Sequence, residues 1–259
     1  MGASARVPRV PPRRPPTATR EILGGDPPGL RSGDEMAEPH LGRRYRAVLF
    51  DMDGVITDSM PHHYEAWRRI FATFDIPVTR EEIFAREGEK GEVTVRAVLA
   101  RHGIHPTEQE LGELLREKEE LFRSFASVPR LFPGAEECVR ALYDLGKKLA
   151  LVTGTSSAEL RSNLPRTLLP LFHAIVSGDM VTRGKPEPEP YVTALGRLGV
   201  GPSEAVVVEN APYGIRSAKA AGLYCIALTT SLPPPFLAEA DLILEDMHAV
   251  RKVLCEPSG

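Results

Sequence analysis

From residue 133 to its end, the chain alternates short apolar segments with segments of helical periodicity. The predicted strands in this region are Lys148–Thr153, His173–Ser177, Ala205–Glu209, Tyr224–Leu228 and Asp241–Leu244, and the predicted helices are Ala135–Leu145, Ser157–Leu169, Tyr191–Leu198 and Gly214–Ala221. One earlier apolar run, Arg46–Asp51, is typical of a buried parallel strand. Strands that are joined through helices require right-handed crossovers. The pattern therefore predicts an α/β fold with a doubly wound parallel sheet.

A block of helical periodicity, residues 62–125, separates the first predicted strand from the others. Its first apolar stripe consists of Ala66, Trp67, Ile70, Phe71 and Phe74, and its second of Val93, Val95, Ala97 and Leu99. Thr107 followed by Glu110 predicts a capping box for a third helix that ends near Phe125. We therefore predict an inserted all-helical cap, residues 62–128, within an α/β core made of residues 46–61 and 129–259.

Residues 1–45 differ in composition from the rest of the chain. They contain 8 of its 24 prolines, many arginines and no aromatic residue before Tyr45. Such a segment buries too little apolar surface to offset its ordering entropy, so it is predicted to be a disordered Pro/Arg-rich extension. The lack of aromatic side chains disfavours RNA binding, and the lack of an apolar run disfavours a secretory signal. Whether residues 1–35 are a real tail, or Met36 is the start, stays open.

Charge and cysteine content exclude several classes of function. With 32 basic and 35 acidic residues the formal charge is −3, which predicts neither nucleic-acid nor membrane partners. The sequence contains no run of about 18 apolar residues that would cross a bilayer. Three scattered cysteines match neither a disulfide framework nor a zinc site. We expect reduced thiols and a cytoplasmic protein that is a monomer or weak homodimer.

Polar side chains are found at the carboxyl ends of the predicted strands. Asp51 ends the first strand and Asp53 follows it, Thr153 ends the next strand, and Glu209-Asn210 end a later one. In open α/β sheets ligands bind at this edge. Taken singly, each residue also has an ordinary interpretation as a turn, cap or surface side chain, and the same holds for Lys185. Their occurrence together predicts one polar crevice.

Four segments resemble the motifs of the haloacid dehalogenase superfamily, in the family's order over roughly residues 46–245. They are Asp51-Met-Asp53-Gly54-Val55-Ile56-Thr57-Asp58, then Leu151–Gly154, Gly184–Pro188 and Val208–Gly214. The resemblance implies a Rossmann-like core, and the helical insert is similar to the cap of β-phosphoglucomutases and phosphoglycolate-type phosphatases. A single Asp-x-Asp-Gly sequence would be a weak signal, whereas four motifs in order are a strong one.

The resemblance also implies a chemistry for each motif residue. Asp51 would be the nucleophile that becomes phosphorylated, and Asp53 the acid/base that serves the leaving oxygen and then water. Thr153, Gly154 and Lys185 would hold the phosphoryl oxygens. Mg²⁺ is the implied cofactor, with the Asp51 side chain, the Asp53 backbone carbonyl, Glu209 and Asn210 as its ligands. An acid at position 53 favours phosphoesters over haloacids and phosphonates.

Asn210 is a departure, because the fourth motif usually ends in two acids. An amide oxygen ligates Mg²⁺ without contributing charge, so we expect weaker metal binding in an active enzyme. His63 matches a hinge histidine of β-phosphoglucomutases that would face the substrate, or it simply opens the first cap helix. Cap residues 86–92, with three acids beside Arg86 and Lys90, would clamp a second phosphate poorly.

The sequence thus favours a Mg²⁺-dependent phosphatase of a small phosphate monoester, either a phosphosugar or a phosphoglycolate-like metabolite. A β-phosphoglucomutase-like mutase is the first alternative. A non-catalytic metabolite-binding protein on the same fold is the second, because a fold alone does not establish an activity.

Overall fold

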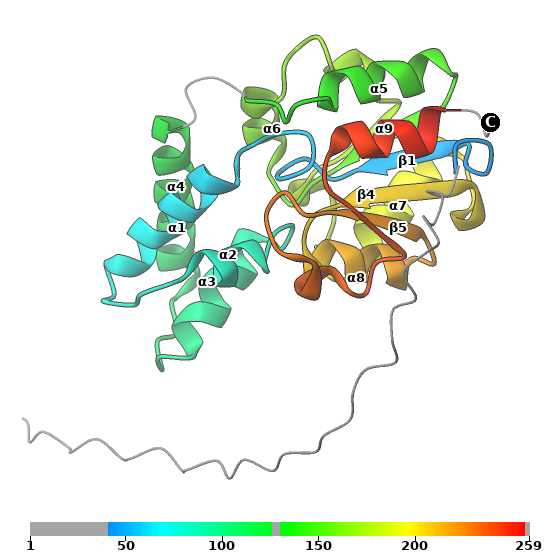
Figure 1. Cartoon of the computed structure of the whole chain (residues 1–259). Helices are drawn as coiled ribbons and strands as arrows, with labels where there is room; N and C mark the ends of the chain where they lie inside the picture. Colours follow the sequence, from blue (N-terminus) through cyan, green and yellow to red (C-terminus); the bar gives the residue numbers. More distant parts are fainter. Residues whose placement is uncertain (1–40, 126–129, 257–259) are drawn as a thin grey trace, which may run out of the picture. The chain divides into compact units, whose positions relative to one another are not determined.

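The computed structural model describes residues 41–125 and 130–256. Its sheet, shown in Figure 1, contains strands in the order β3-β2-β1-β4-β5-β6, and every neighbouring pair is parallel. The strands are β1 (Ala47–Phe50), β2 (Lys148–Val152), β3 (Ala174–Val176), β4 (Ala205–Glu209), β5 (Tyr224–Leu228) and β6 (Leu242–Leu244). The predicted doubly wound parallel sheet is confirmed, and each predicted strand overlaps an observed one.

Helices cover both faces of this sheet. They are α5 (Ala135–Asp144), α6 (Ser157–Asn163), α7 (Glu189–Leu198), α8 (Pro212–Ala220) and α9 (Met247–Cys255), with α5 and α9 on one side and α7 and α8 on the other (Figure 1). Successive side chains of a strand point to opposite faces. Accordingly Val48 and Phe50 pack in the layer of α5 and α9, whereas Ala47 and Leu49 pack in the layer of α7 and α8. Burial on both faces explains why the strands are apolar throughout.

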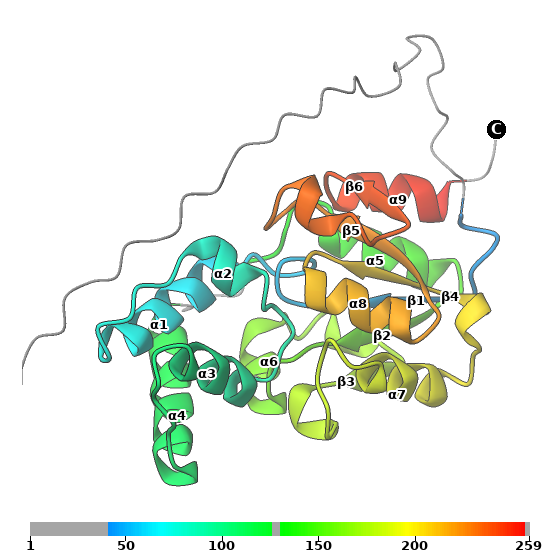
Figure 2. The same cartoon turned by 90° about the horizontal axis from the view of Figure 1, so that it is seen from below.

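Four further helices lie between β1 and α5 in the part of the chain that the structure describes, and Figure 2 shows them grouped together. They are α1 (Met60–Ala72), α2 (Arg80–Phe84), α3 (Gly91–Ala100) and α4 (Glu108–Phe125). Helix α1 packs along α4. Thr107 Oγ1 accepts a hydrogen bond from Glu110 N at 3.3 Å, and Glu110 Oε2 accepts one from Thr107 N at 2.8 Å, so the predicted capping box is present. The division into core and cap at residues 62 and 128 remains a proposal.

Several predicted details were wrong. The buried face of α3 is formed by Thr94, Val95, Val98 and Leu99, while Val93 is exposed, because helical periodicity places i, i+1, i+4 and i+5 on one face. Helix α6 ends at Asn163 instead of Leu169, just before Pro165. Helices α2 and α9 were not predicted. No described helix is long and apolar enough to cross a membrane.

The predicted order boundary at Arg46 was also wrong. Residues 1–40 of the expected disordered extension lie outside the described residues, but residues 41–45 are placed against the core. Leu41 and Tyr45 are buried, and Leu41 N donates a hydrogen bond to Val253 O at 2.9 Å. Leu41 thus contacts the unpredicted helix α9, and the Tyr45 ring packs on Tyr224 of β5, with ring centroids 5.7 Å apart.

Candidate active site

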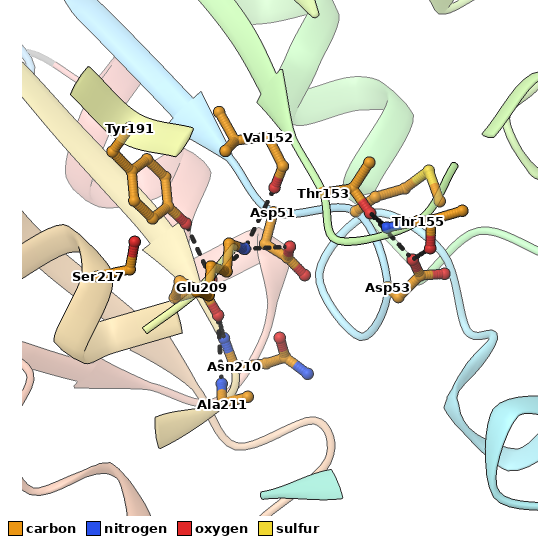
Figure 3. A network of polar contacts seen from close by, with 12 residues as sticks. Asp51, Asp53, Val152, Thr153, Thr155, Tyr191, Glu209, Asn210, Ala211 and Ser217 are labelled. Atoms are coloured by element: carbon orange, nitrogen blue, oxygen red, sulfur yellow. Dashed lines mark hydrogen bonds and ion pairs between the residues drawn. The ribbon is translucent and has the colours of Figure 1, made fainter. Parts of the chain in front are cut away.

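The motif residues meet at the carboxyl edge of the sheet, as Figure 3 shows. Asp51 directly follows β1, Thr153 follows β2, and Glu209 ends β4. All three side chains are buried. Lys185 approaches from the loop before α7, and its ammonium lies 2.6 Å from Asp51 Oδ1 and 2.7 Å from Glu209 Oε1. Side chains that are distant in sequence thus meet in one buried polar cluster.

The Lys185 ammonium is the centre of this cluster. It is 2% exposed, and it also donates to Val152 O at 3.2 Å. Burial alone would lower the pKa of Lys185, but the carboxylates of Asp51 and Glu209 outweigh burial and raise it. Lys185 is therefore charged at every physiological pH. Tyr191 of α7 donates to Glu209 Oε1 at 2.8 Å, which holds the second carboxylate in place.

Asp51 has one occupied and one free oxygen. Oδ1 accepts from Lys185, whereas Oδ2 is buried and has no hydrogen-bond partner among the described residues. Burial is the largest influence on its pKa, Lys185 opposes it, and Glu209 and Asp53 add repulsion, so that the pKa rises to about 8. One ammonium does not compensate the carboxylates of this crevice. Negative charge at this site is thus incompletely compensated, and one buried oxygen lacks a partner. Both features suit the binding of a further cation.

Asp53 points away from Asp51 into a set of hydroxyl groups (Figure 3). Its Oδ1 accepts from Ser59 at 2.5 Å and lies 3.3 Å from His63 Nε2, and its Oδ2 accepts from Thr155 at 2.9 Å and from Thr153 at 3.4 Å. Burial would raise the pKa of Asp53, but the contact with His63 and the hydrogen bonds from His63, Ser59 and Thr155 lower it to about 2. In this arrangement Asp53 is an ionised acceptor.

A lysine of the cap orients His63. Lys118 Nζ lies 3.2 Å from His63 Nδ1 and donates to Glu159 Oε1 at 3.3 Å. An ammonium only donates, so His63 Nδ1 must accept and Nε2 carries the proton that faces Asp53. The His63 ring also stacks on Phe122, with ring centroids 4.2 Å apart. This chain of contacts joins cap helices α1 and α4 to core helix α6 and ends on Asp53.

The candidate metal ligands differ in how many of their oxygens already accept hydrogen bonds. Glu209 has partners on both oxygens, because Oε2 accepts from the backbone N–H groups of Asn210 at 2.9 Å and Ala211 at 3.3 Å. Asn210 is fully buried, and its Oδ1 has no partner within the described parts of the chain. In those parts no three His, Cys, Asp or Glu side chains are grouped to hold a metal by themselves. Two free oxygens, Asp51 Oδ2 and Asn210 Oδ1, nevertheless suit a hard cation such as Mg²⁺.

A cavity of about 250 Å³ lies between the cap and the core, and His63, Gly154 and Thr155 are among its lining residues. Its cap side includes His63, Trp67, Arg86, Glu87, Lys90 and Lys118, and its core side includes Gly154, Thr155, Ser156, Glu159 and Asp179. The cap loop fits closely against the core, since a Cβ at Gly154 would lie 2.6 Å from Gly88 O. Glu87 lines the same cavity, and burial together with the carboxylates of Asp53 and Asp51 raises its pKa.

Every predicted site residue thus lies at or beside this crevice, although the individual roles remain predictions. The sequence allows two interpretations of His63, either as a hinge histidine between core and cap or as a residue that opens the first cap helix. Its direct contact with Asp53 favours the first interpretation. Sequence reasoning missed Lys118, Thr155, Tyr191 and Glu87. Of these four, only Thr155 could have been suspected from the sequence, because it lies two residues after Thr153 at the end of a predicted strand. The others reach the site from helices or loops distant in sequence.

Comparisons with known proteins agree with this geometry. The model of the haloacid dehalogenase-like hydrolase family matches residues 45–222. Validoxylamine A 7'-phosphate phosphatase of Streptomyces hygroscopicus subsp. limoneus is 32% identical, over 80% of this chain and 96% of its own length. The β-phosphoglucomutase of Bacillus subtilis strain 168 is 31% identical, over 77% of this chain and 88% of its own.

A solved structure is similar over a comparable range. A substituted variant of CbbY from Rhodobacter sphaeroides, in complex with xylulose-1,5-bisphosphate, superposes with a TM-score of 0.66. It is 30% identical in sequence, and the match covers 78% of this chain and 95% of CbbY. The relatives thus include a phosphatase, a mutase and a protein with a bound phosphosugar.

Proposed function

This chain belongs to the haloacid dehalogenase-like hydrolase family and is a phosphoric monoester hydrolase. On that premise we propose that its substrate is a small phosphosugar or polyol phosphate whose leaving group is uncharged. The observation that carries the catalytic part is the buried contact of 2.6 Å between Lys185 Nζ and Asp51 Oδ1, beside the free Asp51 Oδ2. It supports a carboxylate that attacks phosphorus while an ammonium binds a phosphoryl oxygen.

In the first step the Asp51 carboxylate displaces the alcohol and forms an aspartyl phosphate. Lys185 and Thr153 hold the phosphoryl oxygens and stabilise the charge that develops on them. Gly154 would bind the phosphate through its backbone, and a side chain there would overlap the cap loop at Gly88. In the second step water attacks the phosphorus, releases phosphate and restores Asp51.

Asp53 handles the proton in both steps. With a pKa lowered to about 2, Asp53 is a carboxylate in the free enzyme. The second step requires this form, because Asp53 then accepts a proton from the attacking water. The first step requires a proton on Asp53, and the negative charge of an incoming phosphate raises its affinity for one. His63, which is held through its Nδ1 by Lys118, stabilises the carboxylate form that remains once this proton has passed to the leaving oxygen.

Mg²⁺ is the proposed cofactor, held by Asp51, Asn210 and the Asp53 backbone carbonyl, with Glu209 beside them. When bound, it would supply the positive charge that offsets repulsion between the carboxylate and the phosphate. The free oxygens of Asp51 and Asn210 support this assignment. Glu209 as a direct ligand has less support, because both of its oxygens are already engaged.

The cavity favours a neutral leaving group. Arg86 Nη1 donates to Glu89 at 2.8 Å, Lys90 Nζ donates to Val181 O at 2.6 Å, and Lys118 is paired with Glu159. Arg86 and Lys118 are therefore paired with carboxylates, whereas Lys90 is held by a backbone carbonyl. A carboxylate, as in phosphoglycolate, or a second phosphate, as in a mutase cycle, would need a free cation. Hydroxyl groups need only the acceptors and donors that line the wall.

A phosphate-release screen tests this proposal. We expect Mg²⁺-dependent release from hexose and polyol phosphates at a kcat/KM at least tenfold above that for phosphoglycolate, inorganic pyrophosphate and nucleotides, and none from Asp51→Asn. Preference for an anionic leaving group would overturn the substrate class. Conversion of a sugar 1-phosphate to the 6-phosphate with little free phosphate would favour the mutase, whose similarity to this chain makes it the second candidate.

We further propose a cytoplasmic monomer or weak homodimer that has no nucleic-acid or membrane partner. The free thiols of Cys138, Cys225 and Cys255 support a reducing compartment. Cell fractionation and analytical ultracentrifugation would test the two parts of this proposal separately.

A further inference from the structure

We infer that Ser231 is a positioning residue that turns the side-chain oxygen of Asn210 toward the metal site. The inference rests on the proposed function, because it concerns a metal held at Asn210. Ser231 lies in the loop after β5, and Asn210 lies directly after β4. Their side chains therefore meet at the same edge of the sheet, and none of the four motifs includes Ser231.

The two ends of the Asn210 amide have different surroundings. Nδ2 donates a hydrogen bond to Ser231 Oγ at 2.9 Å. Oδ1 is buried and, among the residues that the structure describes, has no partner. Buried polar atoms in proteins are nearly always paired, so a free amide oxygen at this edge indicates a missing donor or cation. The Ser231 hydroxyl, which accepts as well as donates, satisfies the nitrogen and leaves the oxygen free.

This orientation matters because position 210 carries an amide. A carboxylate presents an oxygen to a cation whichever way it is turned, whereas an amide turned by half a rotation presents N–H donors and repels the cation. An asparagine ligand therefore needs a partner that fixes its direction, and an aspartate ligand does not. Without the Ser231 hydroxyl the buried Nδ2 would lose its acceptor, and the amide would be free to turn.

Packing around the pair restricts Asn210 to these two orientations. Thr230 Oγ1 donates to Gly54 O at 2.5 Å, which ties the loop after β5 to the turn after β1. Gly54 has φ +91°, and a Cβ there would overlap the Asn210 amide and lie 2.8 Å from Ser231 Oγ. The turn thus closes over Asn210 so tightly that only glycine fits. Within this space the hydrogen bond to Ser231 Oγ stabilises the orientation in which Nδ2 faces Ser231 and Oδ1 faces the metal site.

The test is a double-mutant cycle on Mg²⁺ affinity, measured by calorimetry on the metal-free full-length protein. We expect Ser231→Ala to weaken Mg²⁺ binding about tenfold, in the range found when a partner of a metal ligand is removed. Asn210→Asp should bind Mg²⁺ more tightly than the wild type. Adding Ser231→Ala to Asn210→Asp should change the affinity less than about twofold, because a carboxylate has no wrong orientation.

Two further variants separate positioning from general damage. Ser231→Thr keeps the hydroxyl and should retain the wild-type affinity. Ser217→Ala removes a buried serine hydroxyl of α8 that donates to Glu187 O at 2.6 Å, and it should leave Mg²⁺ binding unchanged. Thermal unfolding without metal shows whether each variant folds.

The outcomes are distinguishable. Equal losses from Ser231→Ala in both backgrounds, or no loss in the wild-type background, would overturn the positioning role while leaving the proposed phosphatase intact. A wild-type protein that bound no Mg²⁺ but hydrolysed phosphosugars would overturn the proposed cofactor and the positioning role together.

Discussion

The ammonium of Lys185 lies 2.6 Å from the Asp51 carboxylate, although 134 residues separate the two in the sequence. Both side chains are buried, and the same ammonium contacts Glu209 at 2.7 Å. This contact links the proposed nucleophile to the group that would bind the transferred phosphate. It also matters for the fold, because without Lys185 the buried carboxyl groups of Asp51 and Glu209 would face each other with no cation between them.

Replacing Lys185 by Met should damage both folding and activity. Removal of one partner from a buried ion pair leaves an uncompensated charge and costs about 3–5 kcal/mol. Loss of a charged donor to the transferring phosphoryl group lowers kcat by about a hundredfold to a thousandfold. Urea unfolding and phosphate release measure the two effects. Unchanged stability would mean that the Lys185 ammonium is not needed to compensate the buried carboxyl groups beside it.

The pKa of Asp51 makes Mg²⁺ binding depend on pH. In the metal-free fold this carboxyl has a pKa of about 8, whereas its ordinary value is 3.8. Between pH 3.8 and pH 8 the folded state therefore holds a proton that the unfolded state lacks. Stability of the metal-free protein should therefore fall as pH rises through this window, and Mg²⁺ affinity should increase up to about tenfold per pH unit below 8. Mg²⁺ should release close to one proton at pH 7.

Calorimetry in buffers of different ionisation enthalpy counts that proton. Asp51→Asn, which has no titrating group at position 51, is the matched control and should release none. Binding of Mg²⁺ to the wild type without proton release would show that Asp51 is already ionised in the metal-free fold.

Lys118→Met should lower kcat about tenfold to a hundredfold, because His63 loses the donor that fixes its tautomer toward Asp53. It should also destabilise the fold, since Glu159 remains buried without its partner. Adding Glu159→Gln should recover stability but not kcat.

Lys219→Met, which removes a partly exposed lysine paired with Asp241, is the control and should leave kcat unchanged. Equal kcat for Lys118→Met and the wild type would contradict the role of this contact.

Glu89→Gln should widen the substrate range. Glu89 accepts from Arg86 and from Thr94, both at 2.8 Å, so its neutralisation frees a guanidinium at the cavity wall. We expect kcat/KM for phosphoglycolate to increase about tenfold relative to that for a phosphosugar, which corresponds to one charge-assisted hydrogen bond. A parallel fall for both substrates would indicate damage to the loop instead of a change in specificity.

The sequence predicted those parts of the site that follow from strand order. Asp51 and Thr153 directly follow a strand and Glu209 ends one. Parallel strands bring their carboxyl ends to one edge, so the meeting of these residues could be predicted from the sequence. Lys118 was not predictable in this way. It lies in an acidic helix among exposed glutamates, and nothing local shows that it is buried against His63 and Glu159.

The same limit applies to Ser231 and to the chain before β1. Ser231 lies in a loop without periodicity, and its contact with Asn210 depends on the separation of β4 and β5 in space. Leu41 and Tyr45 are buried against parts of the chain far away in sequence, so composition alone assigned them to the extension. Local patterns predicted the elements and the strand-end residues, whereas side chains that join distant elements required the fold.

The most direct test of the account is detection of the phosphorylated Asp51. Enzyme turning over its best phosphosugar with Mg²⁺ would be quenched in acid, reduced with borohydride and digested for peptide mass spectrometry. Reduction of an acyl phosphate converts the aspartate into homoserine, so we predict homoserine at position 51 and nowhere else, and none without substrate. An active enzyme that retained unmodified aspartate at position 51 under these conditions, or that carried homoserine at another aspartate, would contradict the account.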